Sequence, residues 1–217
     1  LTVGGTTGTG TITDDDAAPT VSSVSSNNNT EGLNVVHTVT LSNASSVSTT
    51  YAISLTDGTA LGGTDYSTTL TNASFNNGVT ISGGTITVPA GVTSFTVSVA
   101  TTSDTIDEAN ETYTLTVGGT SGTGTINDDD GAPTISSVTS PTVTEGTDLV
   151  YTVSLSNASA SATTFAATLG GGASTASAGD FTALASATFS NGVTFSGGNF
   201  TVPAGVTSFT VSVATTS

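Results

Sequence analysis

The chain has 217 residues, of which 16 are acidic, one is histidine and none is lysine or arginine, so its net charge at pH 7 is −16. Nucleic acids and anionic membrane surfaces both require cationic contacts, and this composition therefore argues against either as a partner. The absence of cysteine excludes disulfides and zinc–thiolate sites, and no apolar run approaches the roughly 20 residues that span a bilayer, so no membrane insertion is expected.

The composition favours small β-rich domains over a disordered acidic tail. Hydrophobic residues make up 35% of the chain, with valine, leucine, isoleucine and alanine prominent among them. A disordered segment has few β-branched residues and scattered charge, whereas here β-branched residues are abundant and the acids are clustered. The chain has no initiator methionine and no signal-like segment, so we expect it to be a window from a longer polypeptide.

Internal repeats divide the chain. The first 16 residues, LTVGGTTGTGTITDDD, return as LTVGGTSGTGTINDDD at 115–130, and VPAGVTSFTVSVATTS occurs at 88–103 and at 202–217, an offset of 202 − 88 = 114 residues. Self-similarity at a fixed period indicates a tandem array. We therefore predict three pieces. Residues 1–16 are the C-terminal strand of a preceding repeat, 17–130 form a complete repeat (the first repeat), and 131–217 form a second repeat that lacks its last strands.

Polar and apolar residues alternate along the predicted strands of the first repeat. His37, Val39 and Leu41 share one face of a strand, and the runs SFTVSV at 94–99 and TYTLTV at 112–117 alternate in the same way. Asn77–Gly78 and Gly83–Gly84 are typical of tight turns. About seven or eight such strands per repeat, without helical periodicity, predict an all-β chain of tandem immunoglobulin-like antiparallel β-sandwiches.

Seven carboxylates lie at the two ends of the stretch from 104 to 130, with two alternating runs between them. Clustered carboxylates repel one another unless a positive charge lies among them, and this chain has no basic side chain to supply it. Ca²⁺ takes six to eight oxygen ligands, often carboxylates, at about 2.3–2.6 Å. We interpret the cluster as a calcium site; the alternative is a solvated acidic pole. The seven residues are Asp104, Asp107, Glu108, Glu111, Asp128, Asp129 and Asp130.

Several motifs in order resemble the Calx-β domain, and specifically the Calx-β-like repeats found in tandem in large secreted bacterial adhesins of the RTX type. They are TEG at 30–32, GGTDY at 62–66, VPAG at 88–91, DTIDEANETY at 104–113 and INDDD at 126–130. The resemblance covers nearly the whole chain. It implies an immunoglobulin-like sandwich that binds Ca²⁺ at one end, on the surface of a bacterial cell or secreted from it.

The same resemblance implies which residues bind the metal. By motif, the ligands of the first repeat are Glu31, Asp65, the acidic turn and the closing Asp run. The acidic turn holds Asp104, Asp107, Glu108 and Glu111, and the Asp run is Asp128, Asp129 and Asp130. Asp14, Asp15 and Asp16 are the corresponding run of the preceding repeat, and Glu145 and Asp180 match positions in the second repeat. The family's usual second acid after Asp104 is Thr105 here, a departure that points to fewer ions or weaker binding.

The sequence gives no support for catalysis. His37 is replaced by Tyr151 in the second repeat, which favours a packed strand residue over a catalytic base. No serine lies in a Gly-x-Ser-x-Gly elbow, so a Ser/His/Asp arrangement has no basis. Paired carboxylates can cleave glycosides, but here they recur once per repeat in a chain without tryptophan, which is more typical of structure.

We therefore expect a non-enzymatic extender of a secreted, cell-surface adhesin, in which calcium stiffens each repeat and its junction with neighbouring repeats of the same polypeptide. A second hypothesis is a subunit of an extracellular fibre or surface lattice, in which residues 1–16 of one chain complete the second repeat of an identical chain by strand addition. A third, a carbohydrate-binding module, lacks the aromatic platform that such a module needs.

Overall fold

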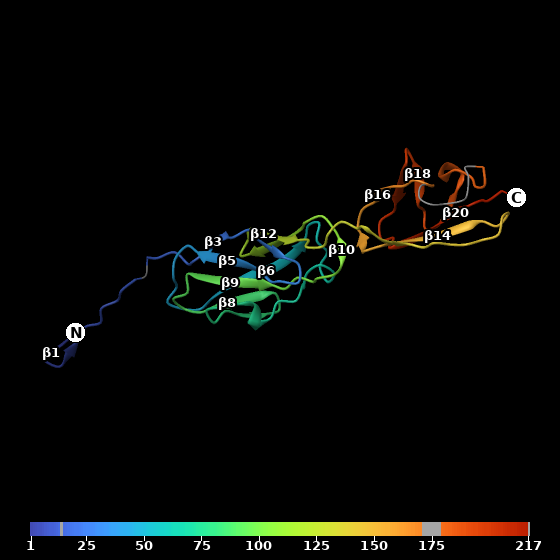
Figure 1. The fold of residues 1–217 in the computed structure, drawn as a ribbon. Coiled ribbons are helices and arrows are strands. Elements are labelled where there is room, and N and C mark those ends of the chain that lie inside the picture. Colours follow the sequence, from blue (N-terminus) through green and yellow to red (C-terminus); the bar gives the residue numbers. More distant parts are fainter. Residues whose placement is uncertain (14, 171–178, 217) are drawn as a thin grey trace. The chain divides into compact units, whose positions relative to one another are not determined.

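Residues 1–13, 15–170 and 179–216 are described by the computed structural model, and strands form nearly all of its regular structure (Figure 1). The helical elements of these ranges are two single 3₁₀ turns, η1 (Asn72–Ser74) and η2 (Leu184–Ser186). Within these ranges no helix is long and apolar enough to cross a membrane. The prediction of an all-β chain is confirmed.

The chain divides into two compact units whose boundaries cut across the sequence repeats. The first unit comprises Leu1–Asn28, Val35–Ala100 and Thr112–Gly124. The second unit comprises Asn29–Asn34, Thr101–Glu111 and Thr125–Ser217. Glu31, the acidic turn and the closing Asp run therefore all belong to the second unit, whereas Asp65 belongs to the first.

The strands of the first repeat form two sheets, and the pairs β3–β5, β5–β9, β6–β8, β6–β11 and β7–β8 are antiparallel. One has the order β3-β5-β9 and the other the order β4-β12-β11-β6-β8-β7, and two-residue β10 lies outside both. The strands are β3 (Val21–Val24), β4 (Asn27–Thr30), β5 (Val35–Leu41), β6 (Thr49–Asp57), β7 (Thr80–Ser82), β8 (Thr85–Val88), β9 (Ser94–Val99), β10 (Ile106–Asp107), β11 (Glu111–Val117) and β12 (Thr120–Asn127).

Alternation along these strands builds the core, because successive side chains of a strand point to opposite faces. In β5, Val35, His37 and Val39 have no exposed surface, while the residues between them are exposed. β9 and β11 bury every second residue in the same way. The turn between β7 and β8 places Gly83 and Gly84 at φ of 54° and 75°, a conformation that glycine adopts without a steric penalty.

Aromatic residues join the two sheets of the first repeat. The ring of Tyr113 on β11 meets the ring of His37 on β5 edge to face at 5.7 Å, and it stacks on the ring of Tyr66 at 4.6 Å. Because β5 and β11 belong to different sheets, these contacts lie inside the sandwich. The immunoglobulin-like sandwich predicted from the sequence is therefore present.

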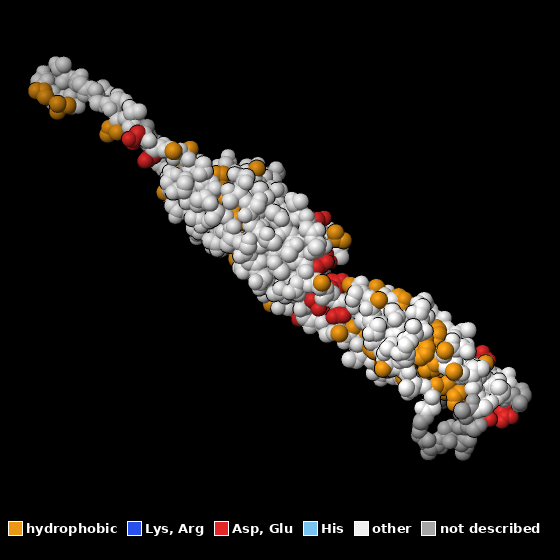
Figure 2. Space-filling view, turned by 90° about the horizontal axis from the view of Figure 1, so that it is seen from above, with side chains coloured by type: hydrophobic (Ala, Val, Ile, Leu, Met, Phe, Trp, Pro, Cys, Tyr) orange, Lys and Arg blue, Asp and Glu red, His pale blue; other side chains and the backbone are white. Residues whose placement is uncertain are grey.

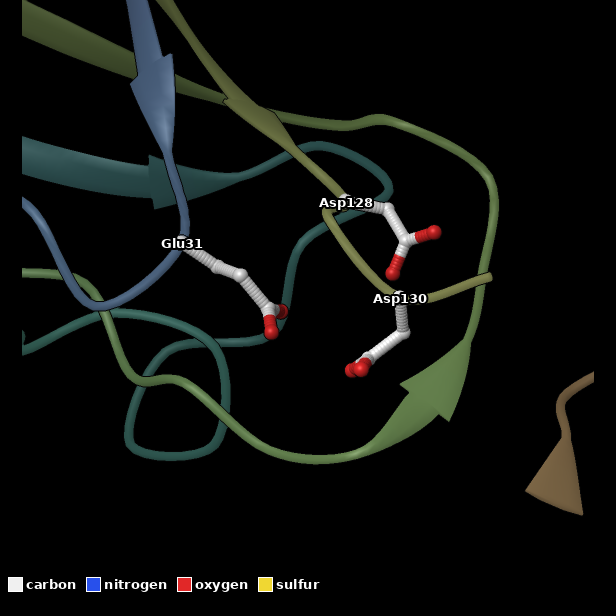
Figure 3. A group of neighbouring side chains, drawn as sticks. All are labelled: Glu31, Asp128 and Asp130. Carbon is white, nitrogen blue, oxygen red and sulfur yellow. The ribbon is translucent and has the colours of Figure 1, made fainter. Parts of the chain in front are cut away.

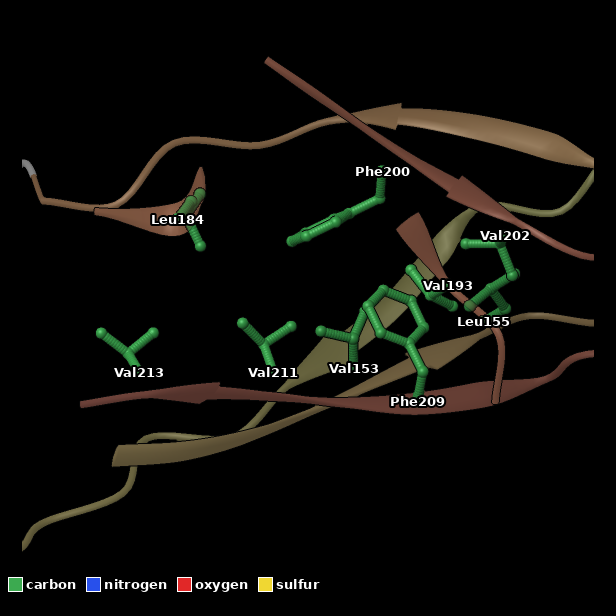
Figure 4. Close-up of a cluster of buried hydrophobic side chains, with 9 residues drawn as sticks. All are labelled: Val153, Leu155, Leu184, Val193, Phe200, Val202, Phe209, Val211 and Val213. Atoms are coloured by element: carbon green, nitrogen blue, oxygen red, sulfur yellow. The ribbon is translucent and has the colours of Figure 1, made fainter. Parts of the chain in front are cut away.

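The second repeat has a shorter set of strands in two sheets, β13-β14-β20-β17 and β16-β19-β18, with β15 outside them. Figure 4 shows Phe200 and Leu184 on one side of its core, facing Val153 and Val211 on the other. The strands are β13 (Ile135–Val138), β14 (Leu149–Leu155), β15 (Ala158–Ser159), β16 (Thr163–Ala166), β17 (Thr188–Phe189), β18 (Thr194–Ser196), β19 (Asn199–Val202) and β20 (Ser208–Val213).

Among the described residues of 1–16, β1 (Thr2–Val3) and β2 (Thr6–Thr7) form a small hairpin. Every described residue of this segment is exposed. The apolar side chains of Leu1, Val3 and Ile12 keep 92%, 69% and 98% of their surface accessible. The segment therefore has no core of its own.

Candidate metal centre

Glu31 is held at the end of the sandwich by its own backbone. β4 ends at Thr30, and the Glu31 amide donates to the carbonyl of Asn127 at 3.0 Å, where β12 ends. Gly32 follows with φ of 72°, and a Cβ there would lie 2.8 Å from the Cβ of Ser103. The chain can therefore turn sharply after Glu31 only because residue 32 is glycine.

Asp128 and Asp130 follow β12 directly. Residues two apart in an extended segment share a face, and both side chains are partly buried while Asp129 between them is exposed. The amide of Asp128 donates to Oδ1 of Asn110 at 3.1 Å, which ties the Asp run to the loop after β10. The strand geometry thus directs the first and third aspartates of the run to one side.

Three carboxylates meet at this point, from Glu31, Asp128 and Asp130 (Figure 3). One oxygen of each lies within 4.8 Å of the others. Glu31 Oε1 accepts the Asp104 amide at 3.2 Å and the Ser103 hydroxyl at 3.5 Å. Asp128 Oδ1 and Asp130 Oδ2 are inaccessible to solvent and have no hydrogen-bond partner in the described part of the chain. Buried carboxylate oxygens without a donor are costly, and this chain has no basic side chain to offset them.

Electrostatics at the cluster disfavour three negative charges. Burial raises the pKa of Glu31, the carboxylates of Asp104, Asp129 and Asp130 raise it further, and the bond from the Asp104 amide opposes them. Burial also raises the pKa of Asp130, with further increases from the carboxylates of Asp128, Asp129, Asp104 and Asp107. A bound cation would reverse both effects. The all-oxygen donor set suits a hard ion such as Ca²⁺, and Glu31, Asp128 and Asp130 are the residues that would hold it.

The acidic turn borders this cluster. Asp104 Oδ1 accepts the amide of Ile106 at 2.7 Å, which shapes the start of β10. The three-carboxylate group does not include Asp104, Asp107, Asp129, Glu108 or Glu111. Asp104, Asp107 and Asp129 nevertheless lie close enough to raise the pKa of Asp130. Their role as ligands stays a prediction.

Asp65 has a different setting, in the first unit. Its Oδ2 accepts the amide of Leu61 at 2.6 Å, and its own amide donates to the Leu61 carbonyl at 2.9 Å. Asp65 therefore closes the loop that precedes Tyr66. The structure does not bring it into the three-carboxylate group, and a ligand role for it also stays a prediction.

The remaining predicted ligands that the structure describes lie outside the three-carboxylate group. Asp15 and Asp16 are exposed, and Asp14 lies outside the described residues. Glu145 is exposed in a turn where Gly146 donates to Thr215 Oγ1 at 2.9 Å. The carbonyl of Asp180 accepts the amide of Thr216 at 3.0 Å. These contacts resemble ordinary loop contacts, and the metal role of all five residues stays a prediction.

Three residues with side-chain contacts in these regions were not predicted from the sequence: Asn110, Ser103 and Asp57. Asn110 and Ser103 position the cluster, and both lie within or beside the DTIDEANETY motif, so motif membership was an available signal. Asp57 lies in the first unit and accepts the Tyr66 hydroxyl at 2.6 Å and the Gly62 amide at 2.9 Å. No sequence pattern distinguishes Asp57, because its partners are brought to it by the fold.

The family model of the Calx-beta domain matches residues 14–140. A crystal structure of CBD12 from CALX1.2 is 13% identical with a TM-score of 0.41 and covers 89% of this chain and 75% of its own. A crystal structure of the calcium binding domain CBD12 of CALX1.1 is 17% identical with a TM-score of 0.36 and covers 60% of this chain and 55% of its own.

A search of curated proteins gives no match. The family match nevertheless spans more than half of the chain and contains the whole three-carboxylate group. Calx-beta domains are calcium-binding domains, and the oxygen donors of this group fit that property. The chain belongs to the Calx-beta domain family.

Proposed function

We propose that the chain is a calcium-binding structural extender of a secreted, cell-surface adhesin, and that it is not an enzyme. One observation carries the calcium part of this proposal. Asp128 Oδ1 and Asp130 Oδ2 are buried without a hydrogen-bond donor beside the carboxylate of Glu31. The tandem repetition at 114 residues (202 − 88) supports the extender part, because each added repeat lengthens such a protein.

Contacts within the second unit support a role for the ion at the junction between repeats. β10, which follows the acidic turn, pairs in parallel with β15 of the second repeat, with Ile106 opposite Ala158 and Asp107 opposite Ser159. The Asp107 carbonyl accepts the Ala160 amide at 2.9 Å and the Ser159 hydroxyl at 3.2 Å. An ion that orders the turn before β10 therefore also orders a strand that the second repeat uses.

The linker after the Asp run is also bonded to the second repeat. Asn157 Nδ2 donates to the carbonyl of Gly131, the residue directly after Asp130, at 2.9 Å. Asn43 makes the equivalent bond to the carbonyl of Ala17, directly after Asp16, at 3.0 Å. The same hydrogen bond from asparagine to the residue after each Asp run supports a junction that repeats along the array. Calcium would stiffen this junction by offsetting the repulsion among the carboxylates of the Asp run.

Titration calorimetry of the 217-residue protein with Ca²⁺ tests the proposal. The unmodified protein should bind calcium, and the double variant Asp128→Asn, Asp130→Asn should lose that binding. Asp15→Asn is the matched control, since it removes the carboxylate of an exposed aspartate outside the three-carboxylate group. Equal binding by all three proteins would contradict the site, and no binding by the unmodified protein would contradict the calcium role.

A further inference from the structure

Each repeat carries an Asn–Gly turn at the same place. The pairs are Asn77–Gly78 and Asn191–Gly192, separated by the 114-residue offset (191 − 77). φ is 52° at Asn77 and 72° at Gly78, and it is 55° at Asn191 and 71° at Gly192. Two successive residues in the left-handed region are typical of a type I′ turn. All four residues are exposed to solvent.

The asparagine side chain ties each turn to a neighbouring strand. Nδ2 of Asn77 donates to the carbonyl of Ser94, the first residue of β9, at 2.8 Å. Nδ2 of Asn191 donates to the carbonyl of Ser208, the first residue of β20, at 2.7 Å. A carbonyl can only accept a hydrogen bond, so the side chain at this position must donate one. An ionised aspartate has no donor and could not make this bond.

An asparagine that is followed by glycine can lose its side-chain amide without a catalyst. The glycine nitrogen attacks Cγ of the asparagine and bonds to it. The Cγ–Nδ2 bond breaks, and the proton of the glycine amide leaves with Nδ2 as ammonia. Water then opens the resulting succinimide ring at either carbonyl, which gives aspartate or isoaspartate. Glycine favours the attack because it has no Cβ to shield its nitrogen.

The folded turn opposes this reaction at both positions. A residue other than glycine with φ of 52° or 55° has ψ of about +30° to +60°. At such a ψ the nitrogen of the next residue lies opposite Cβ across the Cα–C bond, so it cannot reach Cγ. The bond from Nδ2 to the neighbouring strand also holds the side chain in place. The turn must therefore open and rotate about Cα–C before the ring can close.

Deamidation would also prevent the turn from closing again. The carboxylate of the product would face the carbonyl oxygen of Ser94 or Ser208, and two acceptors cannot form a hydrogen bond. The chain has no lysine or arginine to offset the new charge, and the face in Figure 2 shows acidic side chains but no basic ones. Isoaspartate would in addition lengthen the backbone of the turn by one carbon atom.

We propose that Asn77 and Asn191 are modification sites, at which water deamidates the side chain only after the turn has opened. The modified turn then stays detached from β9 or β20, so each repeat keeps an irreversible record of opening. The inference goes beyond the proposed function and does not depend on calcium. A protein that binds no calcium would leave this inference intact, and the absence of deamidation would leave the calcium site intact.

Peptide mass spectrometry of the 217-residue protein, incubated at mildly alkaline pH in buffer and in denaturant, tests the two sites. In denaturant, Asn77 and Asn191 should deamidate faster than Asn43 and Asn157, which precede alanine and serve as matched controls. In the folded protein the rate at Asn77 and Asn191 should be at least about tenfold lower, because the turn must first open. Equal rates in the folded and denatured protein would overturn the protection by the turn. Rates in denaturant that do not exceed those of the controls would overturn the sites themselves.

Two substitutions test the consequence of the modification. Asn77→Asp introduces the carboxylate of the product, and it should lower the melting temperature by about several degrees. Asn77→Gly is the matched control, since glycine accepts the positive φ and removes the same hydrogen bond without adding a charge. It should lower the melting temperature less. A melting temperature of Asn77→Asp equal to that of the unmodified protein would overturn the detachment of the modified turn.

Discussion

At the scale of single residues, the burial of His37 could be predicted from the sequence, but its hydrogen-bond partners could not. Alternation along its strand predicted a packed side chain, and its complete burial confirms this. Its partners come from distant segments. Nδ1 lies 2.7 Å from the Ser25 carbonyl, which can only accept, so Nδ1 carries the proton and Nε2 accepts from the Tyr113 hydroxyl at 3.0 Å. A period-two pattern places a residue inside but does not predict these partners.

Stability should depend on pH through His37. Burial lowers its pKa in the folded protein, outweighing the opposite effect of the bond to Ser25. The unfolded chain protonates the imidazole near pH 6.5. The free energy of unfolding should therefore fall as pH drops below that value, by up to about 1.4 kcal/mol per pH unit from this group.

Denaturant unfolding of the unmodified protein and of His37→Gln at several pH values measures this effect. Glu31 and Asp130, whose pKa values are raised, act in the opposite sense, and both proteins retain them. The two proteins should differ in how steeply the free energy of unfolding depends on pH, and that difference gives the contribution of the imidazole. Equal pH dependence in both proteins would show that the pKa of His37 does not change on folding.

A pair of glycines in equivalent sequence gives a second test at this scale. A Cβ at Gly124 would lie 2.2 Å from Cζ of Tyr113, whereas a Cβ at Gly10 would meet nothing within 4 Å. Gly124→Ala should therefore destabilise the protein by about 1–3 kcal/mol or more, and Gly10→Ala should be nearly neutral. Thermal unfolding measures the stability of both variants. An equal loss of stability in the two variants would contradict the packing of β12 against Tyr113.

At the scale of elements, part of the metal centre follows from strand periodicity. Asp128 and Asp130 share a face because they are two apart, as the sequence suggests. Their meeting with Glu31 depends on β4 lying beside β12, a long-range pairing that a motif can suggest only through its family. The placement of Asp65 in a separate loop depends on the hydrogen bond to Leu61, which no spacing rule predicts.

The Asp run after β12 gives a test at this scale. Asp130→Asn should change the melting temperature in opposite directions in chelator and in excess calcium. In chelator the substitution should raise the melting temperature, because it removes a charge that burial and neighbouring carboxylates disfavour. In excess calcium it should lower the melting temperature relative to the unmodified protein, because a ligand is lost. Asp15→Asn should change neither value. A change of melting temperature in the same direction in both conditions would contradict a metal-binding role for Asp130.

At the scale of the whole molecule, the repeat offset predicted the strand pattern well. β5, β8 and β9 have counterparts β14, β19 and β20 at the expected positions. The sequence did not predict that β4 would lack a counterpart in the second repeat. β4 exists by pairing with β12, and residues 141–144 form no strand because the described chain offers them no such neighbour. Secondary structure at a sheet edge is thus decided by the adjacent strand as well as by local sequence.

The most direct test of the calcium hypothesis is thermal unfolding of the 217-residue protein in excess Ca²⁺ and in chelator. A ligand that binds only the folded state at 100 times its Kd adds about 2.7 kcal/mol, so calcium should raise the melting temperature by several degrees. The increase should disappear in the double variant Asp128→Asn, Asp130→Asn and persist in Asp15→Asn. An unmodified protein that unfolds at the same temperature in calcium and in chelator would contradict the hypothesis and leave the acidic cluster as a solvated pole.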